Sequence, residues 1–210
     1  DGTVTYADTS KVWYNYCDKV WANAVILNSG ASYKVGDTIK ESDIQSYFVW
    51  IPKYKYKLWN TGTASKNIHE IDIVFDTKDT TDISGVSCKT PMTSGSSGNC
   101  KNGEYMTHPA FISMGVNGFW AGKFETGYKG ATSATAAQVN SSDSSKIIIK
   151  PNSYSWRNST VMNMFTASYN YKRAMNSHMM KNTEWGAVAY LSHSKYGINK
   201  ELNINNNSSY

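Results

Sequence analysis

Charged residues are scarce in this chain, and those of positive sign are not concentrated. Asp, Glu, Lys and Arg make up only 18% of the 210 residues, and the formal net charge is +5. Nucleic-acid binding usually requires a concentrated basic face. The segment KYKYK at 53–57 alternates Lys with Tyr, which indicates a strand with Lys toward solvent and Tyr toward the core. The sequence therefore predicts no nucleic-acid partner.

Long apolar runs are also lacking. No stretch approaches the roughly 20 apolar residues that a membrane-spanning helix needs, so we expect no membrane span in this chain. No signal peptide is recognisable, and the chain starts at Asp1 rather than Met. This start indicates a mature or trimmed product.

Cysteines are few, namely Cys17, Cys88 and Cys100. Their spacing does not match the close pairs of a zinc site. Cys88 and Cys100 flank a loop of turn-forming residues. A disulfide between them would stabilise that loop by roughly 3 kcal/mol, and such bonds persist outside the cell. Cys17 is left over, either buried or paired elsewhere.

Motifs of catalysis are missing. There is no Gly-x-Ser-x-Gly elbow, no phosphate loop and no dinucleotide fingerprint. The four histidines are scattered: His69, His108, His178 and His193. We expect His108, before Pro109, to pack or to cap a turn. The sequence thus predicts a protein that is not an enzyme and has no cofactor. A calcium site stays open as an alternative, because four aspartates cluster in the sequence: Asp72, Asp76, Asp79 and Asp82. They do not follow the pattern of a calcium-binding loop, so solvated loop carboxylates are the preferred interpretation.

Aromatic residues, in contrast, are plentiful, with 15 Tyr and 7 Trp. The polar surface must come mainly from Ser, Thr, Asn and Gly, because charges are few. Surfaces rich in Tyr, Asn and Ser are typical of recognition proteins, since Tyr gives a large contact area at low entropic cost. The composition therefore favours an extracellular protein.

Strand patterns fill the first part of the chain. Two aromatic-rich runs within residues 1–30 predict a hairpin around Cys17, with Trp13 and Trp21 on one core. Residues 41–48 predict a helical turn with Ser42 as N-cap. Further strands are expected at 48–59, broken at Pro52, and elsewhere at the following positions: 69–76 with Ile71, Ile73 and Phe75 inward, 118–128, and 146–151.

Two helices are expected between residues 156 and 196. In the first, apolar residues recur at helical spacing at Val161, Phe165, Tyr169 or Tyr171, and Met175, which predicts a buried face. The second is capped by Asn182 or Thr183 and ends at Gly197. Its predicted buried face consists of Trp185, Val188, Ala189 and Leu191.

The order of strands and helices predicts an α+β fold in four segments. These are a β-rich segment 1–76, a surface loop 77–104 with the disulfide, a core 105–197 with two helices, and a polar tail 198–210.

Four short motifs follow one another along the chain: HPAF, NGFWAGKFETG, KPNSYSW and KNTEWGAVAYL. Over residues 105–197 they resemble the formylglycine-generating-enzyme (sulfatase-modifying-factor) family, a variant of the C-type lectin fold. Similar sequences occur in surface or pilin-like proteins of gut Firmicutes and in phages. The resemblance implies a C-type-lectin-like mixed fold of antiparallel strands and two helices. Matching residues with a structural role are Trp120, Glu125, Trp156, Glu184 and Trp185.

Two departures from the family limit what the resemblance implies. The family's late Gly-rich stretch and closing strands have no counterpart before Tyr210, so the C-terminal strands are apparently missing from this chain. Another chain or a C-terminal fragment is one way to complete the fold. The copper-binding cysteine pair of the catalytic members also has no counterpart, so we do not expect their activity. For Glu184 and Trp185 we expect a scaffold role, with Trp185 wedging its helix onto the sheet and Glu184 bonding the free amides.

Three functions remain as hypotheses. The first is an extracellular binding or adhesion module on a bacterial surface fibre or phage particle, recognising a host glycan or protein. Its ligand-binding residues would lie in the tail: Asn203, Asn205, Asn206, Asn207 and Tyr210. The second is a structural subunit of a pilus or filament, completed by a neighbouring subunit. The third is an oxidase of the formylglycine-generating type, which only the scaffold suggests.

Overall fold

The computed structural model describes residues 4–58, 71–75, 87–88, 105–200 and 202. The chain has an α+β fold, with antiparallel strand pairs and α-helices. It divides into two compact units that alternate along the sequence. Unit 1 comprises Asp1–Tyr14, Trp21–Trp50 and Trp120–Met180, and unit 2 comprises Asn15–Val20, Ile51–Phe119 and Lys181–Tyr210. Each unit therefore consists of three stretches that are not consecutive in the chain, whereas the segments expected from sequence are consecutive.

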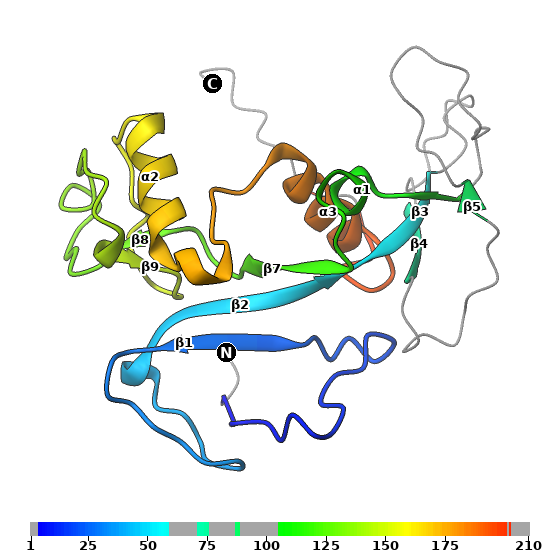
Figure 1. Cartoon of the computed structure of the whole chain (residues 1–210), viewed down its shortest axis with the longest axis horizontal. Helices are drawn as coiled ribbons and strands as arrows, with labels where there is room; N and C mark the ends of the chain where they lie inside the picture. Colours follow the sequence, from blue (N-terminus) through cyan, green and yellow to red (C-terminus); the bar gives the residue numbers. More distant parts are fainter. Residues whose placement is uncertain (1–3, 59–70, 76–86, 89–104, 201, 203–210) are drawn as a thin grey trace. The chain divides into compact units, whose positions relative to one another are not determined.

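The elements follow one another in an order that is dominated first by strands and later by helices (Figure 1). The strands are β1 Asn23–Leu27, β2 Ile44–Pro52, β3 Tyr54–Leu58, β4 Ile71–Phe75, β5 Ser87–Cys88, β6 Tyr105–Thr107, β7 Gly118–Gly122, β8 Gly127–Tyr128 and β9 Ile147–Ile148. The α-helices are α1 Pro109–Met114, α2 Val161–Tyr171 and α3 Asn182–His193, and the 3-10 turns are η1 Glu41–Asp43, η2 Ser144–Lys146 and η3 Arg173–Met175.

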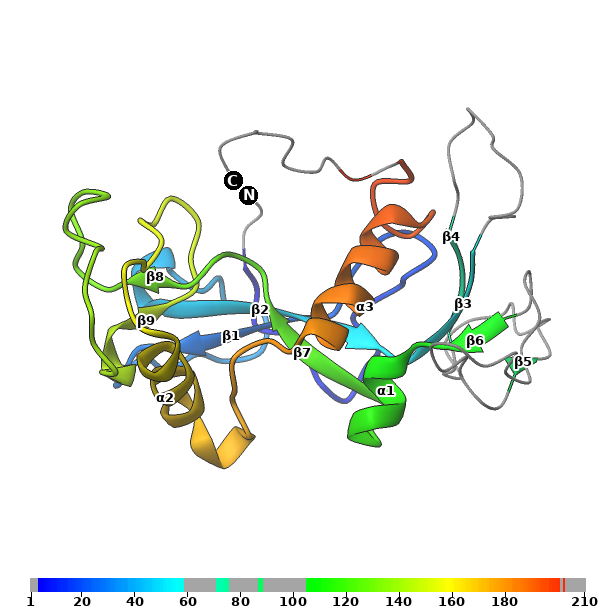
Figure 2. The same ribbon diagram turned by 90° about the horizontal axis from the view of Figure 1, so that it is seen from above.

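In unit 1 the strand β2 is the centre of a sheet in the order β1-β2-β7. Strands β1 and β2 are antiparallel, with Ala24 opposite Phe48. The helix α2 lies beside the β8-β9 pair in both views (Figures 1 and 2). Its Ala167 joins Ile147 and Ile149 in a core that Phe48, Trp156 and Tyr171 complete. This core holds one face of β2 against β9 and α2.

The start of α2 is determined locally. Thr160 has extended backbone angles, and its side-chain oxygen accepts a hydrogen bond from the Asn163 amide at 3.2 Å. This satisfies one of the amide groups that the first turn of a helix leaves free. No β-branched run interrupts the following turns, and Lys172 leaves helical geometry at φ −143°.

Unit 2 contains a sheet in the order β4-β3-β6-β5. Strands β3 and β4 are antiparallel, with Tyr56 opposite Ile73. The strand β4 confirms the expected alternation, since Ile71, Ile73 and Phe75 are buried while the residues between them are half-buried. The break at Pro52 is also confirmed: β2 ends there, as expected for a residue that cannot donate to a ladder, and β3 starts at Tyr54.

The helices α1 and α3 of unit 2 pack against each other (Figure 2). Ala187 and Leu191 of α3 are buried, and the Tyr54 hydroxyl donates to the Ala187 carbonyl at 2.7 Å. The Glu184 carboxylate accepts a hydrogen bond from the Lys181 amide at 2.7 Å. Because the Lys181 ammonium has no lone pair to offer, only the glutamate half of a capping box forms.

The expected hairpin within residues 1–30 is wrong. A turn is present, with Asn15 bridged to Val20 and Lys19 at φ 58°. However, β1 pairs with β2 and not with the residues before the turn. Trp13 is 39% exposed, so it is not the core residue that the hairpin would make it. Local turn chemistry was recognised, but the partner strand comes from farther along the chain.

The helical turn at 41–48 is limited to η1, Glu41–Asp43, because β2 starts at Ile44. Its N-cap is Lys40 and not Ser42. The short helix α1 was not expected. Its start is nevertheless determined by neighbouring residues. His108 accepts a hydrogen bond from the Ala110 amide, and Pro109 occupies the first helical position, where a residue without an amide hydrogen costs no helical hydrogen bond. This confirms His108 as a cap.

Both predicted helix faces need correction. Trp185 is 62% exposed, so it does not wedge α3 onto a sheet. The buried positions of α3 are Glu184, Ala187 and Leu191, so of the predicted face Leu191 is confirmed, while Val188 and Ala189 are half-buried. In α2, most of the predicted face is exposed, Val161 by 71%, Phe165 by 49% and Tyr169 by 39%, whereas Tyr171, the alternative to Tyr169, packs in the core as predicted. The packed side of α2 is the one with Ala167, because the small side chain lets the helix approach β9.

Gly197 does not follow the helix end directly. Helix α3 ends at His193 with Ser194 as C-cap. A Cβ at Gly197 would lie 2.1 Å from the Ser192 carbonyl oxygen, whereas a Cβ at Gly186, inside α3, would meet only the His108 ring at 3.7 Å. Gly197 is therefore required by a close backbone approach.

These two glycines predict substitutions of opposite sign. Gly197→Ala should lower the free energy of unfolding by about 2 kcal/mol or more, because backbone must move to admit the methyl group. Gly186→Ala should raise it by about 0.5–1 kcal/mol through helix propensity. Chemical denaturation of both variants measures the effects, and a loss at Gly186 equal to that at Gly197 would contradict the assigned geometry.

Candidate functional site

A pair of tryptophans on β2 and β7 is the candidate functional site in unit 1. Trp50 and Trp120 have ring centroids 5.3 Å apart with planes inclined by 61°. Trp120 is 42% exposed and Trp50 is half-buried. We call these two residues the tryptophan pair. A large apolar ring that stays exposed beside a second one offers a ready contact area for a ligand.

The position of the tryptophan pair follows from strand alternation. On β2, Ile44, Ser46, Phe48 and Trp50 share one face because side chains alternate. The first of these residues are covered: Ile44 and Ser46 are buried, and Phe48 packs in the core under α2. The residues that cover this face end with Ile149. Its side chain lies over Gly122 of β7, since a Cβ added at Gly122 would be 3.2 Å from it. The tryptophan pair lies farther along the same face and so remains accessible.

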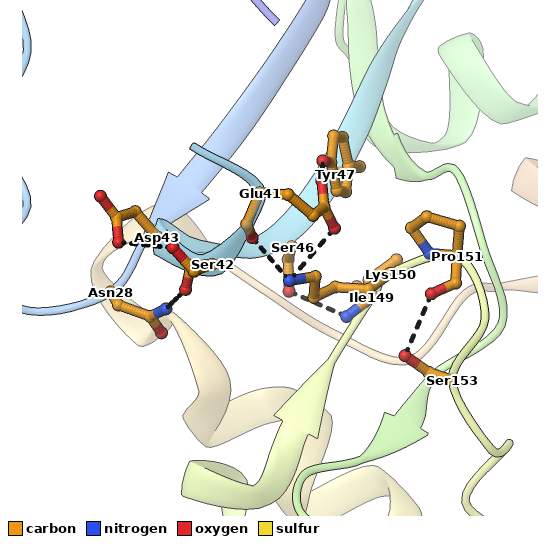
Figure 3. A network of polar contacts seen from close by, with 10 residues as sticks. All are labelled: Asn28, Glu41, Ser42, Asp43, Ser46, Tyr47, Ile149, Lys150, Pro151 and Ser153. Atoms are coloured by element: carbon orange, nitrogen blue, oxygen red, sulfur yellow. Dashed lines mark hydrogen bonds and ion pairs between the residues drawn. The ribbon is translucent and has the colours of Figure 1, made fainter. Parts of the chain in front are cut away.

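A polar network lies at the other end of β2, around η1 (Figure 3). The Lys150 ammonium lies 3.2 Å from the Glu41 carboxylate and donates to the Glu41 carbonyl at 2.8 Å. Tyr47 also donates its hydroxyl to the Glu41 carboxylate. The network joins η1 and β2 to the chain after β9.

The network stabilises the ionised form of Glu41 and the neutral form of Tyr47. Burial raises the pKa of Glu41, but the hydrogen bond from Tyr47 and the Lys150 ammonium outweigh it and hold that pKa below its usual range. Burial, followed by the neighbouring Glu41 charge, raises the pKa of Tyr47 to about 12. At neutral pH Tyr47 is therefore a hydrogen-bond donor, which suits a structural clasp better than acid–base catalysis.

Two of the four family-like motifs, GKFETG and KPNSYSW, come together in unit 1, whereas HPAF and KNTEWGAVAYL belong to unit 2. Glu125 accepts a hydrogen bond from the Ser155 hydroxyl, and the Trp156 amide donates to the Thr126 carbonyl at 2.8 Å. Trp156 is half-buried, with its indole N–H donating to the Val139 carbonyl at 2.7 Å and its ring against Tyr128. The motifs GKFETG and KPNSYSW are thus neighbours in space.

Several predicted site residues lie outside the described residues. These are the tail residues Asn203, Asn205, Asn206, Asn207 and Tyr210, and also Cys100. Of Cys88 only the backbone is described, in β5, so the Cys88–Cys100 disulfide remains a prediction. Cys17 is an exposed free thiol.

The aspartates considered for calcium are described only in part. Asp72 accepts a hydrogen bond from the Tyr105 hydroxyl and lies 4.0 Å from the Lys57 ammonium. Asp76, Asp79 and Asp82 lie outside the described residues. Among the residues that the structure describes, no three His, Cys, Asp or Glu side chains gather closely enough to hold a metal ion. Likewise, no helix in the described part of the chain has the length and apolar character to cross a bilayer.

His108 of unit 2, which the sequence predicts to pack or to cap a turn, does both. His108 is 5% exposed, and its ring has four aromatic neighbours with centroids 5.3–6.1 Å away: Tyr54, Tyr56, Phe111 and Tyr190. Its Nδ1 accepts from the Ala110 amide at 3.2 Å. Burial lowers the pKa of His108 to about 4. The imidazole is therefore neutral at pH 7 and acts as a core residue.

Comparison of this chain with known protein families, with characterised proteins and with solved structures gives no significant match.

The buried imidazole predicts acid destabilisation. In the unfolded chain His108 binds a proton near pH 6.5, and in the folded chain only near pH 4. The unfolded state therefore binds the proton first, so this contribution is complete above about pH 6.5 and falls by roughly 3 kcal/mol as the pH drops to 4. Urea unfolding at several pH values measures it.

His108→Asn is the matched variant, because Asn remains an N-cap acceptor but does not titrate. This variant should lose stability at pH 7 and should lose less on acidification than the parent protein. Parallel pH profiles for the two proteins would contradict the buried neutral state of His108.

Proposed function

We propose that this chain is a non-catalytic extracellular binding module on a bacterial surface fibre or phage particle, which recognises a host glycan or protein. The observation that carries the proposal is the tryptophan pair, a large aromatic surface that stays accessible where the cover of the sheet ends. Its scaffold, in this proposal, is a C-type-lectin-like fold.

The tryptophan pair suits a carbohydrate. The face of an indole carries negative charge density, and the C–H groups of a sugar ring are weakly positive, so a sugar stacks on an exposed Trp. The T-shaped contact with Trp50 restricts the movement of the Trp120 ring in this proposal. A ring that is fixed before binding loses little conformational entropy when a ligand arrives.

The composition supports the same function. Recognition surfaces use Tyr, Asn and Ser as adaptable hydrogen-bonding contacts around rigid aromatic anchors, and this chain is rich in these residues. The tail residues from Asn203 to Tyr210 would add such contacts. A disulfide between Cys88 and Cys100 would restrain a further loop in the oxidising extracellular environment.

A structural subunit of a pilus or filament is the second candidate. The observation in its favour is the position of β1 at one end of the β1-β2-β7 order. An edge strand presents backbone groups that a neighbouring subunit can pair with. In sedimentation experiments this candidate requires concentration-dependent assembly, whereas a binding module remains monomeric.

Binding through the tryptophan pair is testable with an array of host glycans and proteins. We expect the chain to bind at least one ligand, and Trp120→Ala to weaken that binding by roughly 30-fold or more, the cost typical of an aromatic hot spot. Trp185→Ala is the control, because Trp185 is a more exposed tryptophan of unit 2.

Both variants remove an exposed ring, so both should keep the far-UV spectrum of the parent protein. The absence of any ligand above background would contradict the proposed function. Equal losses from Trp120→Ala and Trp185→Ala would contradict the assignment of the site.

A further inference from the structure

Helix α2 has a second apolar side, which is largely exposed among the residues that the structure describes. The packed side contains Ala167 and Tyr171. Val161, Met162, Phe165 and Tyr169 fall within about 100° of arc on another side, given 3.6 residues per turn. Their exposed fractions are 71%, 70%, 49% and 39%. We call these four residues the α2 apolar face.

The rings on this face are ordered against each other. Phe165 and Tyr169 stack with centroids 6.1 Å apart and planes inclined by 5°. The Arg173 guanidinium lies 4.9 Å from the centre of the Tyr169 ring. Val161, Phe165, Tyr169 and Arg173 therefore form one row along the helix, with a cation at its C-terminal end. Such a row combines apolar insertion with a positive charge.

The sequence around this face is mainly basic, and its nearest acidic residue, Asp143, lies beside Lys146 at the cap of η2. From Ser144 to Met180 there is no Asp or Glu, whereas Lys and Arg occur repeatedly, at Lys146, Lys150, Arg157, Lys172 and Arg173. Of these, Lys150 is paired with Glu41. Three exposed methionines extend the apolar character just beyond the helix, namely Met175, Met179 and Met180. An occupant of this surface must therefore be apolar and negatively charged.

We propose that the α2 apolar face docks on the surface of an anionic lipid bilayer. Exposed Phe, Met and Tyr side chains insert at the boundary of headgroups and acyl chains, and neighbouring Lys and Arg attract anionic headgroups. Flexible methionines adapt to such a fluid surface. The inference is independent of the function proposed for the tryptophan pair.

A second copy of the chain is a poorer occupant. In a two-fold symmetric pair, the same surface patch contacts itself, so the basic residues near α2 would lie opposite their own counterparts. Like charges at an interface disfavour association. An acidic protein satisfies the charge, but tight protein partners usually need anchors enclosed in a desolvated pocket. The four side chains of the α2 apolar face belong to one helix and project from it.

Vesicle co-sedimentation with the full chain tests the proposal. The protein should bind vesicles of phosphatidylcholine with phosphatidylglycerol and should not bind vesicles of phosphatidylcholine alone. Met162→Ser combined with Phe165→Ser should weaken binding at least ten-fold. Lys172→Gln combined with Arg173→Gln should weaken it by roughly 30-fold, given about 1 kcal/mol per basic residue near an anionic surface.

Matched control variants distinguish binding through the α2 apolar face from non-specific binding through other exposed apolar or basic residues. Val35→Ser removes another exposed apolar residue of unit 1, 60% exposed, and Lys34→Gln with Lys129→Gln removes two exposed lysines elsewhere in unit 1. These controls should bind anionic vesicles as the parent protein does. Far-UV spectra of all variants should match that of the parent protein at the assay temperature, because none of the substituted side chains is fully buried.

Three results would overturn the proposal. They are no binding to anionic vesicles, equal binding to both kinds of vesicle, and equal losses from the α2 variants and their controls. Polyglutamate is the probe for an acidic protein surface. If it binds through the α2 apolar face while anionic vesicles do not, the partner is an acidic protein and the lipid proposal is wrong.

Discussion

A single hydroxyl group, that of Ser46, joins the parts of unit 1 that the remaining architecture depends on. Ser46 is fully buried on β2. Its oxygen accepts a hydrogen bond from the Ile149 amide at 3.1 Å and lies 2.7 Å from the Tyr171 hydroxyl at the end of α2. A buried polar group is costly unless it is hydrogen-bonded, so this hydroxyl has both of its partners only when the chain after β9 and the end of α2 are in place. It therefore defines which part of β2 is covered.

That cover determines both of the surfaces that we connect with function. Backbone hydrogen bonds from Tyr47 to Ile149 and from Ile149 to Gln45 place the chain after β9 alongside β2. The cover stops at Ile149 and Gly122, which leaves the tryptophan pair accessible on the same face. Because α2 turns Ala167 and Tyr171 toward this core, its other apolar side faces outward. Aromatic side chains of unit 1 are thus exposed at positions that the core of Ile147, Ile149 and Ala167 does not include.

Much of the secondary structure is predictable from sequence, but the choice of covered face is not. The alternation of Ile71, Ile73 and Phe75 predicts one buried side of β4 correctly, because a strand has only two sides. In α2 and α3, apolar residues occur on more than one side, and periodicity cannot tell which side finds a partner. Hence Trp185 is exposed and the neighbouring Glu184 is buried as a cap. The partner of β1 was missed because pairing with β2 is set by residues farther along the chain. The sequence assigns Trp120 a structural role and does not predict its exposure beside Trp50, because that exposure depends on where the cover ends, which no local pattern encodes.

A double-mutant cycle on Ser46 and Tyr171 tests the central claim most directly. The single variants Ser46→Ala and Tyr171→Phe and the combined variant are compared with the parent protein by chemical denaturation. If the buried hydroxyl joins β2 to α2, each single change leaves a polar atom without its partner, and the two changes together cost less than their sum by about 1–3 kcal/mol. Strictly additive effects would contradict the account, because Ser46 and Tyr171 would then contribute to folding independently.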